Sequence, residues 1–144
     1  MTLENRHPNT DIPNPQTEDE SLALAWAVAE AGDDRKAEHI VLLGVEDVCY
    51  LTDYFVIMTG YSTTQVRAIS TAIQNKIEEQ FQRSPERVEG KSEASWILLD
   101  YGEAIAHILL PEERDFYNLE AFWGHAQRIE FHSPSSVSSQ IIGE

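Results

Sequence analysis

The chain has 144 residues, 42% of them hydrophobic, which is typical of one domain with a buried core. Ten Lys and Arg against 25 Asp and Glu give a formal net charge of −15, which repels phosphate and favours a basic protein surface over nucleic acid as the direct partner. The one cysteine, Cys49, excludes an internal disulfide and a Cys-x-x-Cys site. The chain lacks an apolar run of the ~18 residues that a membrane span needs and any signal-peptide or transit-peptide pattern, so we expect a cytosolic protein with no membrane segment.

Composition divides the chain into a folded domain and two flexible ends. Proline and polar residues predict a flexible arm at residues 1–17, and serine predicts a flexible tail at residues 131–144. The domain is therefore expected to cover residues 18–130. Thr17 and Glu20 have the spacing of a capping box, which predicts a helix from Ser21 to Ala31 that ends at Gly32. Its apolar face holds Leu22, Ala25, Trp26 and Ala29.

Two apolar runs and a periodic segment follow. Residues 40–43 and 54–58 are short and unbroken, as in strands that are buried on both faces. Between Gly60 and Pro85, apolar residues recur every three or four positions, which predicts an amphipathic helix. Its buried face holds Val66, Ile69, Ile73, Ile77 and Phe81. Residues 87–89 have the pattern of a short strand, which Gly90 ends.

The last part of the domain predicts a hairpin and a helix. Residues 96–99 and 104–109 are apolar runs joined by a short connection that contains Gly102, which indicates a β-hairpin. Pro111 and the acids after it predict a helix from Glu112 to about Arg128, with Phe116, Leu119 and Trp123 on its buried stripe. The order αββαβββα predicts a single α/β domain, with helices packed on a mixed sheet of about five strands.

A turn between a predicted strand and helix is the main candidate for enzymatic chemistry. In Gly60-Tyr61-Ser62 the backbone N–H groups could hold a phosphate, as in the Gly-Ser turn of nucleotidyltransferases. That chemistry also needs paired carboxylates for two metals, whereas Asp53 and Asp100 stand alone on different elements. The simpler interpretation is that Ser62 or Thr63 caps the following helix.

The histidines and the cysteine give no further candidate. The spacing of the five histidines does not match a metal site, and His107, within a strand, is expected to be a core or rim residue. Cys49 has no basic residue near it in sequence that would lower the pKa of its thiol. We therefore expect no catalytic residue, metal or cofactor.

Aromatic and acidic residues alternate between residues 96 and 123. This composition fits a protein-binding surface for a basic partner. It equally fits an ordinary core with a solvated acidic edge, and periodicity leaves both interpretations open. Tyr117 lies off the predicted core stripe of the last helix.

Six segments, in one order and at one spacing, carry a resemblance to a known family. The sequence from about Ala25 to Trp123 is similar to the ribosomal silencing factor family, RsfS or Iojap. The segments are residues 52–57 (TDYFVI), 60–66 (GYSTTQV), 89–90 (EG), 96–102 (WILLDYG), His107 and residues 113–123 (ERDFYNLEAFW).

The resemblance implies an α/β fold that is nucleotidyltransferase-like but not catalytic. It also implies binding to ribosomal protein uL-fourteen on the large subunit, which blocks association with the small subunit and represses translation when nutrients or energy are short. The sequence leaves open whether the free protein forms a homodimer. A different hypothesis is a nucleotide-binding or nucleotidyltransferase-type enzyme with a degenerate site at Gly60 and Ser62.

Residue by residue, the resemblance implies a partner surface that includes Trp96 and the acid and aromatic that follow its strand, Asp100 and Tyr101. The segment after Pro111 adds Arg114, Tyr117, Leu119 and Glu120. The chain departs from the family at Gly44, where the family's first strand usually ends with an aspartate, so a role for an acid at that strand end is not expected here.

Overall fold

The computed structural model describes residues 15–133, of which residues 15–19 are described for the backbone alone. Most of the predicted arm and tail lie outside these residues, although residues 15–17 belong to the first helix. No helix in the described part has the length and apolar character needed to cross a bilayer. The elements are α1 (Pro15–Asp34), β1 (Glu38–Gly44), β2 (Tyr54–Thr59), α2 (Thr63–Phe81), β3 (Arg87–Glu89), β4 (Trp96–Asp100), β5 (Ala104–Leu109), α3 (Pro111–Tyr117), α4 (Leu119–Phe122) and β6 (Gln127–Glu130).

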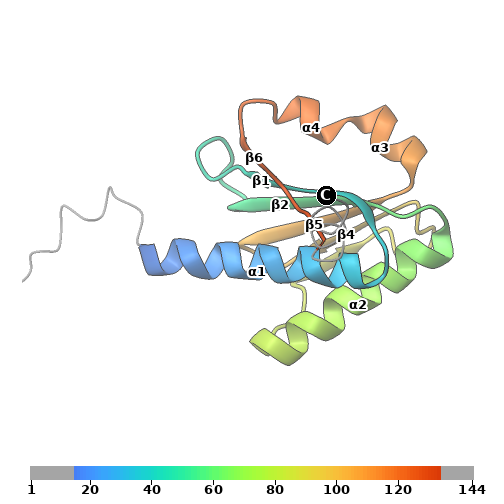
Figure 1. The fold of residues 1–144 in the computed structure, drawn as a ribbon, viewed down its shortest axis with the longest axis horizontal. Coiled ribbons are helices and arrows are strands. Elements are labelled where there is room, and N and C mark those ends of the chain that lie inside the picture. Colours follow the sequence, from blue (N-terminus) through green and yellow to red (C-terminus); the bar gives the residue numbers. More distant parts are fainter. Residues whose placement is uncertain (1–14, 134–144) are drawn as a thin grey trace, which may run out of the picture.

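The strands form one mixed sheet in the order β3-β4-β5-β2-β1-β6 (Figure 1). β2 and β5 pair in parallel, and the other neighbouring strands are antiparallel. The connection from β2 to β5 contains α2, β3 and β4. It is therefore long enough to let the two strands pair in parallel. The carboxyl ends of β2 and β5 therefore lie side by side, with Thr59 opposite Leu109. The predicted α/β domain with a mixed sheet is confirmed, with six strands in place of five.

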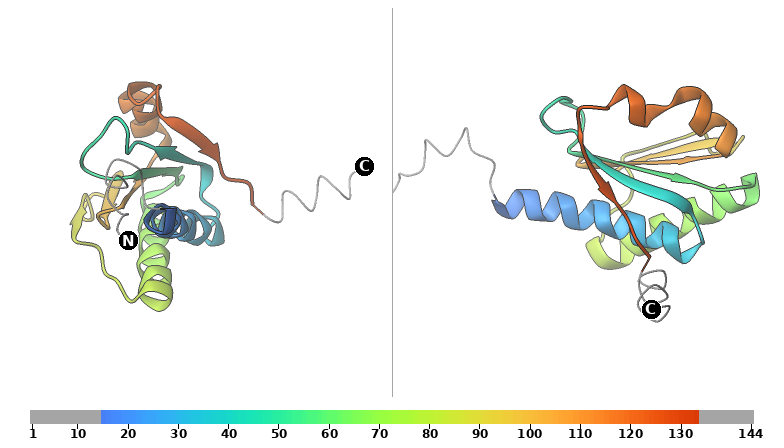
Figure 2. Two further views of the ribbon diagram at one scale, coloured as in Figure 1. Left: turned by 90° about the vertical axis from the view of Figure 1, so that its left-hand side faces the viewer. Right: turned by 45° about the horizontal axis from the view of Figure 1, so that its top comes forward.

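The sheet has an apolar core on each face. Because side chains alternate along a strand, Val56 and Met58 of β2 join the cluster that packs with α1 and α2, whereas Phe55 and Ile57 join a second cluster on the opposite face. Two views show α1 and α2 on one side of the sheet, with α3 and α4 on the other (Figures 1 and 2). The two unbroken apolar runs are thus buried on both faces, as predicted.

The first helix is longer than predicted at both ends. It begins at Pro15, so Thr17 lies inside the helix and is not its N-cap. It continues past Gly32 to Asp34, so Gly32 does not end the helix. The glycine instead allows close packing, because a Cβ at Gly32 would lie 2.4 Å from the Met58 Sδ. Trp26, predicted in the core, is 37% exposed, and one part of its ring contacts Phe131.

The middle of the chain follows the prediction. α2 begins after Ser62, whose Oγ accepts the N–H of Gln65 at 3.0 Å, so Ser62 is the N-cap. The helix buries Val66, Ile69, Ser70, Ile73 and Ile77. β4 and β5 form the predicted antiparallel hairpin, and β3 adds to the free edge of β4.

The prediction of a single last helix from Glu112 to Arg128 is wrong. Asn118 adopts the left-handed conformation (φ 46°, ψ 58°) and separates α3 from α4. Asparagine tolerates this conformation better than most residues, and the Asn118 Oδ1 then accepts the N–H of Ala121 at 3.4 Å. After Gly124 the chain extends into β6, which pairs with β1.

Two consequences follow for side chains at this end of the domain. Phe116, predicted on a buried stripe, is 80% exposed, whereas Leu119 and Trp123 do pack against the second core cluster. Phe131, placed in the tail by the sequence, packs against the first cluster, and its N–H donates to the carbonyl of Ile40 at 3.1 Å. The fold therefore extends at least one residue past the predicted boundary at residue 130.

The backbone at Gly90 generates a stability prediction. Gly90 has φ +82°, and an added Cβ would lie 1.9 Å from the Trp96 carbonyl oxygen. We expect Gly90→Ala to lower the free energy of unfolding by about 2 kcal/mol or more. Alanine disfavours the left-handed conformation, and its Cβ would also clash with the backbone of Trp96. Gly44→Ala is the control, because its Cβ would make ordinary contact with Tyr54 at 3.6 Å. Chemical denaturation of both variants measures the difference, and equal stabilities would contradict the prediction.

Candidate protein-docking surface

Trp96 lies at the start of β4, on the sheet face covered in part by α3 and α4. Its half-buried ring packs with the second core cluster. Its indole Nε1–H donates to the Nδ1 of His107 on β5 at 3.1 Å. The ring of Tyr117, from α3, lies 4.8 Å away from the Trp96 ring, centroid to centroid. Trp96 therefore connects the core histidine to the outer surface.

His107 fixes the orientation of Trp96. It is 6% exposed, and burial lowers the pKa of its imidazole to about 4. The ring is therefore neutral near pH 7, and because the Nδ1 accepts the Trp96 proton, the Nε2 carries the ring proton. The Nε2 is buried without a partner among the described residues. The expectation of a core or rim histidine is confirmed, whereas its bond to Trp96 could not be read from the sequence.

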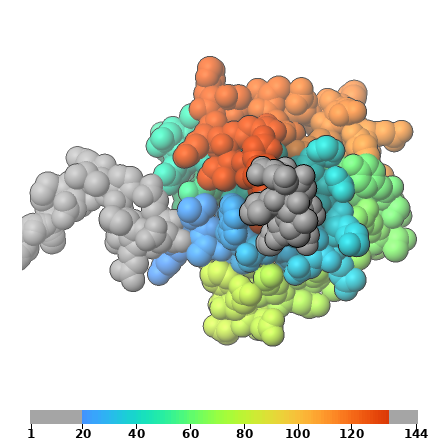
Figure 3. All heavy atoms as spheres, in the orientation of Figure 1, coloured from blue at the N-terminus to red at the C-terminus, as the bar shows by residue number. Residues whose placement is uncertain are grey.

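The exposed end of this cluster is formed by α3. Tyr117 is 51% exposed and Phe116 80%, and their rings meet edge to face at 4.9 Å. Trp96, Tyr117 and Phe116 thus form a continuous series of ring contacts, which we call the aromatic ridge. In the space-filling view, α3 and α4 form the upper edge of the molecule, opposite α2 (Figure 3). Phe122 of α4 is exposed as well.

Arg114 and Glu120 hold α3 and α4 in place. The Arg114 Nε donates to the Glu120 Oε1 at 3.0 Å, and its Nη1 donates to the Thr59 Oγ1 at 2.9 Å. Arg128 of β6 pairs with the second Glu120 oxygen at 3.1 Å. Burial raises the pKa of Glu120, but the hydrogen bonds and charges of the two arginines outweigh it and leave this pKa below its ordinary value. Arg114 and Glu120 are mostly covered, so they shape the surface more than they present charge to it.

Asp100 and Tyr101 lie apart from the aromatic ridge, at the other end of β4. This end is about 13 Å from Trp96 along a strand of five residues. Tyr101 is fully buried with the α1–α2 cluster, and burial raises the pKa of its hydroxyl to about 12. Its side chain therefore has no surface to offer a partner, which corrects the role implied by the resemblance.

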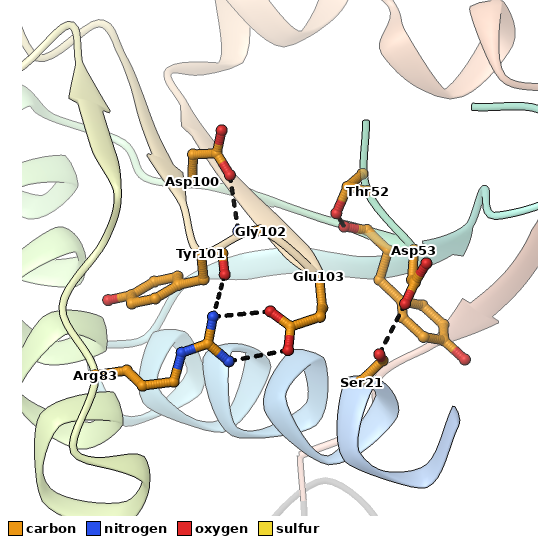
Figure 4. Close-up of polar contacts among 9 residues, drawn as sticks. Ser21, Thr52, Asp53, Arg83, Asp100, Tyr101, Gly102 and Glu103 are labelled. Carbon is orange, nitrogen blue, oxygen red and sulfur yellow. Dashed lines mark hydrogen bonds and ion pairs between the residues drawn. The ribbon is translucent and has the colours of Figure 1, made fainter. Parts of the chain in front are cut away.

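The hairpin turn that contains Asp100 is held by its own contacts (Figure 4). The Asp100 Oδ1 accepts the Gly102 N–H at 2.8 Å, and its other oxygen pairs with Arg87 at 3.4 Å. Arg83 donates to both carboxylate oxygens of Glu103 and to the Tyr101 carbonyl. The Arg83 hydrogen bond opposes the effect of burial and lowers the pKa of Glu103. These bonds stabilise the turn, and both carboxylate oxygens of Asp100 take part in them.

Two backbone donors of the Gly60–Ser62 turn already have partners, since the Gly60 N–H donates to the Leu109 carbonyl and the Tyr61 N–H donates to Gln65. The N–H of Tyr61 donates to the Gln65 Oε1 at 2.7 Å, and the Ser62 Oγ caps α2. Asp53 accepts a hydrogen bond from Ser21 at 2.8 Å. Within residues 15–133, no three His, Cys, Asp or Glu side chains come together as a metal site.

Burial of His107 generates a pH prediction. Its pKa is about 4 in the folded protein and 6.5 when unfolded, so between these values only the unfolded chain binds the proton. The contribution of neutral His107 to folding stability is therefore fully present above pH 6.5, and it is lost as the pH falls toward 4. From pH 7.5 to 5 we expect the parent to lose about 2 kcal/mol more than His107→Gln, which keeps an acceptor but does not titrate. Denaturation at both pH values measures this difference, and parallel losses would show that His107 is not held neutral.

Comparisons with known proteins agree with the fold and the motifs. The family described as "Ribosomal silencing factor during starvation", RsfS, matches residues 18–141, so the match continues past residue 130. The chain is 40% identical over 98 residues to ribosomal silencing factor RsfS of Bacillus subtilis, covering 68% of this chain and 82% of that protein. It is 39% identical over 121 residues to the chloroplastic protein Iojap of Zea mays, covering 82% of this chain and 52% of the relative.

The chain thus spans about half the length of the chloroplast relative. Among solved structures, a crystal structure from Chromobacterium violaceum matches with a TM-score of 0.67 at 32% identity, covering 80% of this chain and 92% of that one. A crystal structure from Bacillus halodurans gives 0.65 at 35% identity, covering 78% and 99%. The family match spans the elements that build the aromatic ridge. This chain belongs to the RsfS family of ribosomal silencing factors.

Proposed function

We propose that this protein binds the large ribosomal subunit through protein uL-fourteen and blocks association with the small subunit, so that translation is repressed when nutrients or energy are limiting. It acts in the cytosol, by occupying a surface and not by catalysis. Family membership supports a role in translation regulation. The observation that carries the proposal is the aromatic ridge, in which the tyrosine and phenylalanine rings of α3 are exposed to solvent and contact Trp96 of the sheet.

Exposed aromatic side chains of this kind are typical of the energetic centre of a protein interface. Tyr and Trp are enriched among the few residues that carry most of the affinity. We assign direct contact to Trp96, Phe116 and Tyr117. Arg114, Leu119 and Glu120 hold the α3–α4 segment against the sheet, and Asp100 and Tyr101 are outside this surface.

Charge favours a protein partner over ribosomal RNA. The chain carries a formal net charge of −15, and Glu89, Glu93 and Glu113 line the surface beside Trp96 and Tyr117. Such a field repels phosphate and accelerates docking onto Lys and Arg. The acids therefore fit a basic ribosomal protein.

The alternative of a nucleotide-binding enzyme has little support from the turn that suggested it. The Tyr61 N–H and the Gln65 N–H already have hydrogen-bond partners, so a phosphate that used these two donors would have to displace them. Asp53 and Asp100 are engaged on different elements, and among the described residues neither belongs to a group of three His, Cys, Asp or Glu side chains that could hold a metal.

Sedimentation tests the proposed function. The protein is expected to travel with free large subunits and to reduce the fraction of joined ribosomes when small subunits are added. In a separate assay it should bind purified uL-fourteen and leave protein-free ribosomal RNA unbound. Binding to naked RNA with none to the protein would contradict the proposal, as would normal subunit joining at saturating protein.

Tyr117→Ala tests the position of the surface. We expect affinity for the large subunit to fall about tenfold or more, since about 1.4 kcal/mol is lost for each factor of ten. The melting temperature should change little, because the Tyr117 side chain is 51% exposed. Tyr50→Ala is the matched control: Tyr50 is fully exposed on the β1–β2 loop. Normal binding by Tyr117→Ala, or an equal loss in Tyr50→Ala, would place the surface elsewhere.

A further inference from the structure

A groove lies beside the aromatic ridge, between α3 and the connection from β3 to β4. It is open and has a volume of about 670 Å³. Trp96 and Tyr117 provide aromatic walls, and Leu98 adds an apolar contact. The backbone of Gly90 and Ser92 forms the opposite side, and the carbonyl of Ser92 accepts a hydrogen bond from Arg67 at 2.8 Å. The groove is thus built on fixed elements.

The charged side chains that line the groove are all acids: Glu89, Glu93 and Glu113. Glu89 pairs with Arg87 at 3.3 Å, which neutralises it in part. Glu113 differs, since its Oε1 is buried and has no hydrogen-bond partner among the described residues. A buried carboxylate oxygen without a donor is unfavourable, so rotation of the Glu113 side chain toward a donor in the groove it lines would be favoured.

The combination of aromatic walls and an unpartnered carboxylate selects one chemical group. A guanidinium is planar, stacks on aromatic rings and donates two parallel N–H bonds to a carboxylate. An ammonium can make the ion pair but lacks the planar face and the fork. A phosphate or a carboxylate would meet three acids.

We propose that this groove receives an arginine side chain of the ribosomal partner, stacked against Trp96 and Tyr117 and bonded to Glu113. The inference rests on the proposed function for the identity of the partner, and it names the chemistry that this same surface recognises. The ridge then supplies apolar contact around the groove, while Glu113 supplies specificity for the cation.

The groove can be tested without a ribosome. The labelled full chain is titrated with N-acetylarginine amide and, in parallel, with the neutral isostere N-acetylcitrulline amide. The indole N–H signal of Trp96, identified by its loss in Trp96→Phe, reports occupancy by NMR. We expect the arginine compound to shift this signal saturably and citrulline to leave it in place. N-acetyllysine amide should bind about threefold or more weakly.

Two glutamates on α3 provide a matched pair of variants. Glu113→Gln should weaken arginine binding about fivefold or more, because a charge-assisted pair becomes a neutral one. Glu112→Gln removes the same charge from the neighbouring exposed position, outside the groove, and should bind as the parent does. Absence of a Trp96 shift, equal binding of citrulline or lysine, or equal effects of the two glutamine variants would overturn the proposal. The comparison of the three compounds on the parent holds even if Glu113→Gln is unstable.

Sedimentation with large subunits separates this inference from the function on which it rests. If the parent binds subunits but the groove ignores arginine, the proposed function stands and the arginine groove is wrong. If the groove binds arginine but the parent does not sediment with subunits, the proposed function is wrong instead. If both hold, Glu113→Gln should reduce subunit binding and Glu112→Gln should not.

Discussion

The sheet has two apolar faces, and residues 15–133, the part that the structure describes, supply long helices for only one of them. α1 and α2, of 20 and 19 residues, cover the first face, whereas α3 and α4, of 7 and 4 residues, cover the second. Burial of apolar surface is the main favourable term in folding, so the second face has to be closed by whatever the short segment can reach. In this short segment the Trp123 ring packs against Phe55, whereas the outer side of Trp96 contacts only the partly exposed ring of Tyr117 among the aromatic side chains of α3 and α4. The exposed rings are a consequence of this thin cover.

A thin cover needs polar bonds to hold its position. The Arg114–Glu120 pair, with Thr59 and Arg128, ties the helical segment to β2 and β6. On the sheet side, His107 holds the Trp96 indole. Partly buried, charge-assisted bonds of this kind are stronger than exposed pairs, and their directionality fixes geometry that apolar contact alone would leave variable. The aromatic rings are therefore presented in one arrangement, which lowers the cost of ordering them on binding.

Patterns within one element predicted the fold, and contacts between distant elements did not follow from them. The unbroken runs, the spacing of Val66 to Ile77 and the glycine in the hairpin each predicted the element that is present. The last helix was overextended because Asn118 and Gly124, both recognisable breakers, interrupt a segment whose apolar spacing is helical. β6 forms through pairing with β1, some 85 residues earlier, which no local pattern reveals.

The candidate site shows the same division between local and distant information. Strand alternation alone would have placed Tyr101 with Ile97 and Leu99, on the helix-covered face and opposite Trp96. The resemblance implied that both Trp96 and Tyr101 belong to the partner surface, although they lie on opposite faces of the sheet. In contrast, the exposed position of Tyr117 agrees with its place off the predicted core stripe, although the same helical spacing wrongly placed Phe116 in the core. The roles of His107 and Glu113 depend on atoms from other elements, so the sequence could not reveal them.

The carboxyl ends of β2 and β5 show why a fold that often carries a ligand site can work as a docking module. In open α/β sheets, ligands bind beyond the carboxyl ends of parallel strands, and a polar cavity of about 400 Å³ does lie there. Its two arginines, Arg114 and Arg128, both pair with Glu120, and Arg114 also bonds Thr59 at the end of β2. The cations that could attract a phosphate are thus used to attach the α3–α4 segment. In this protein, the place where related folds bind a ligand is occupied by the ion pairs and the hydrogen bond that support the aromatic ridge.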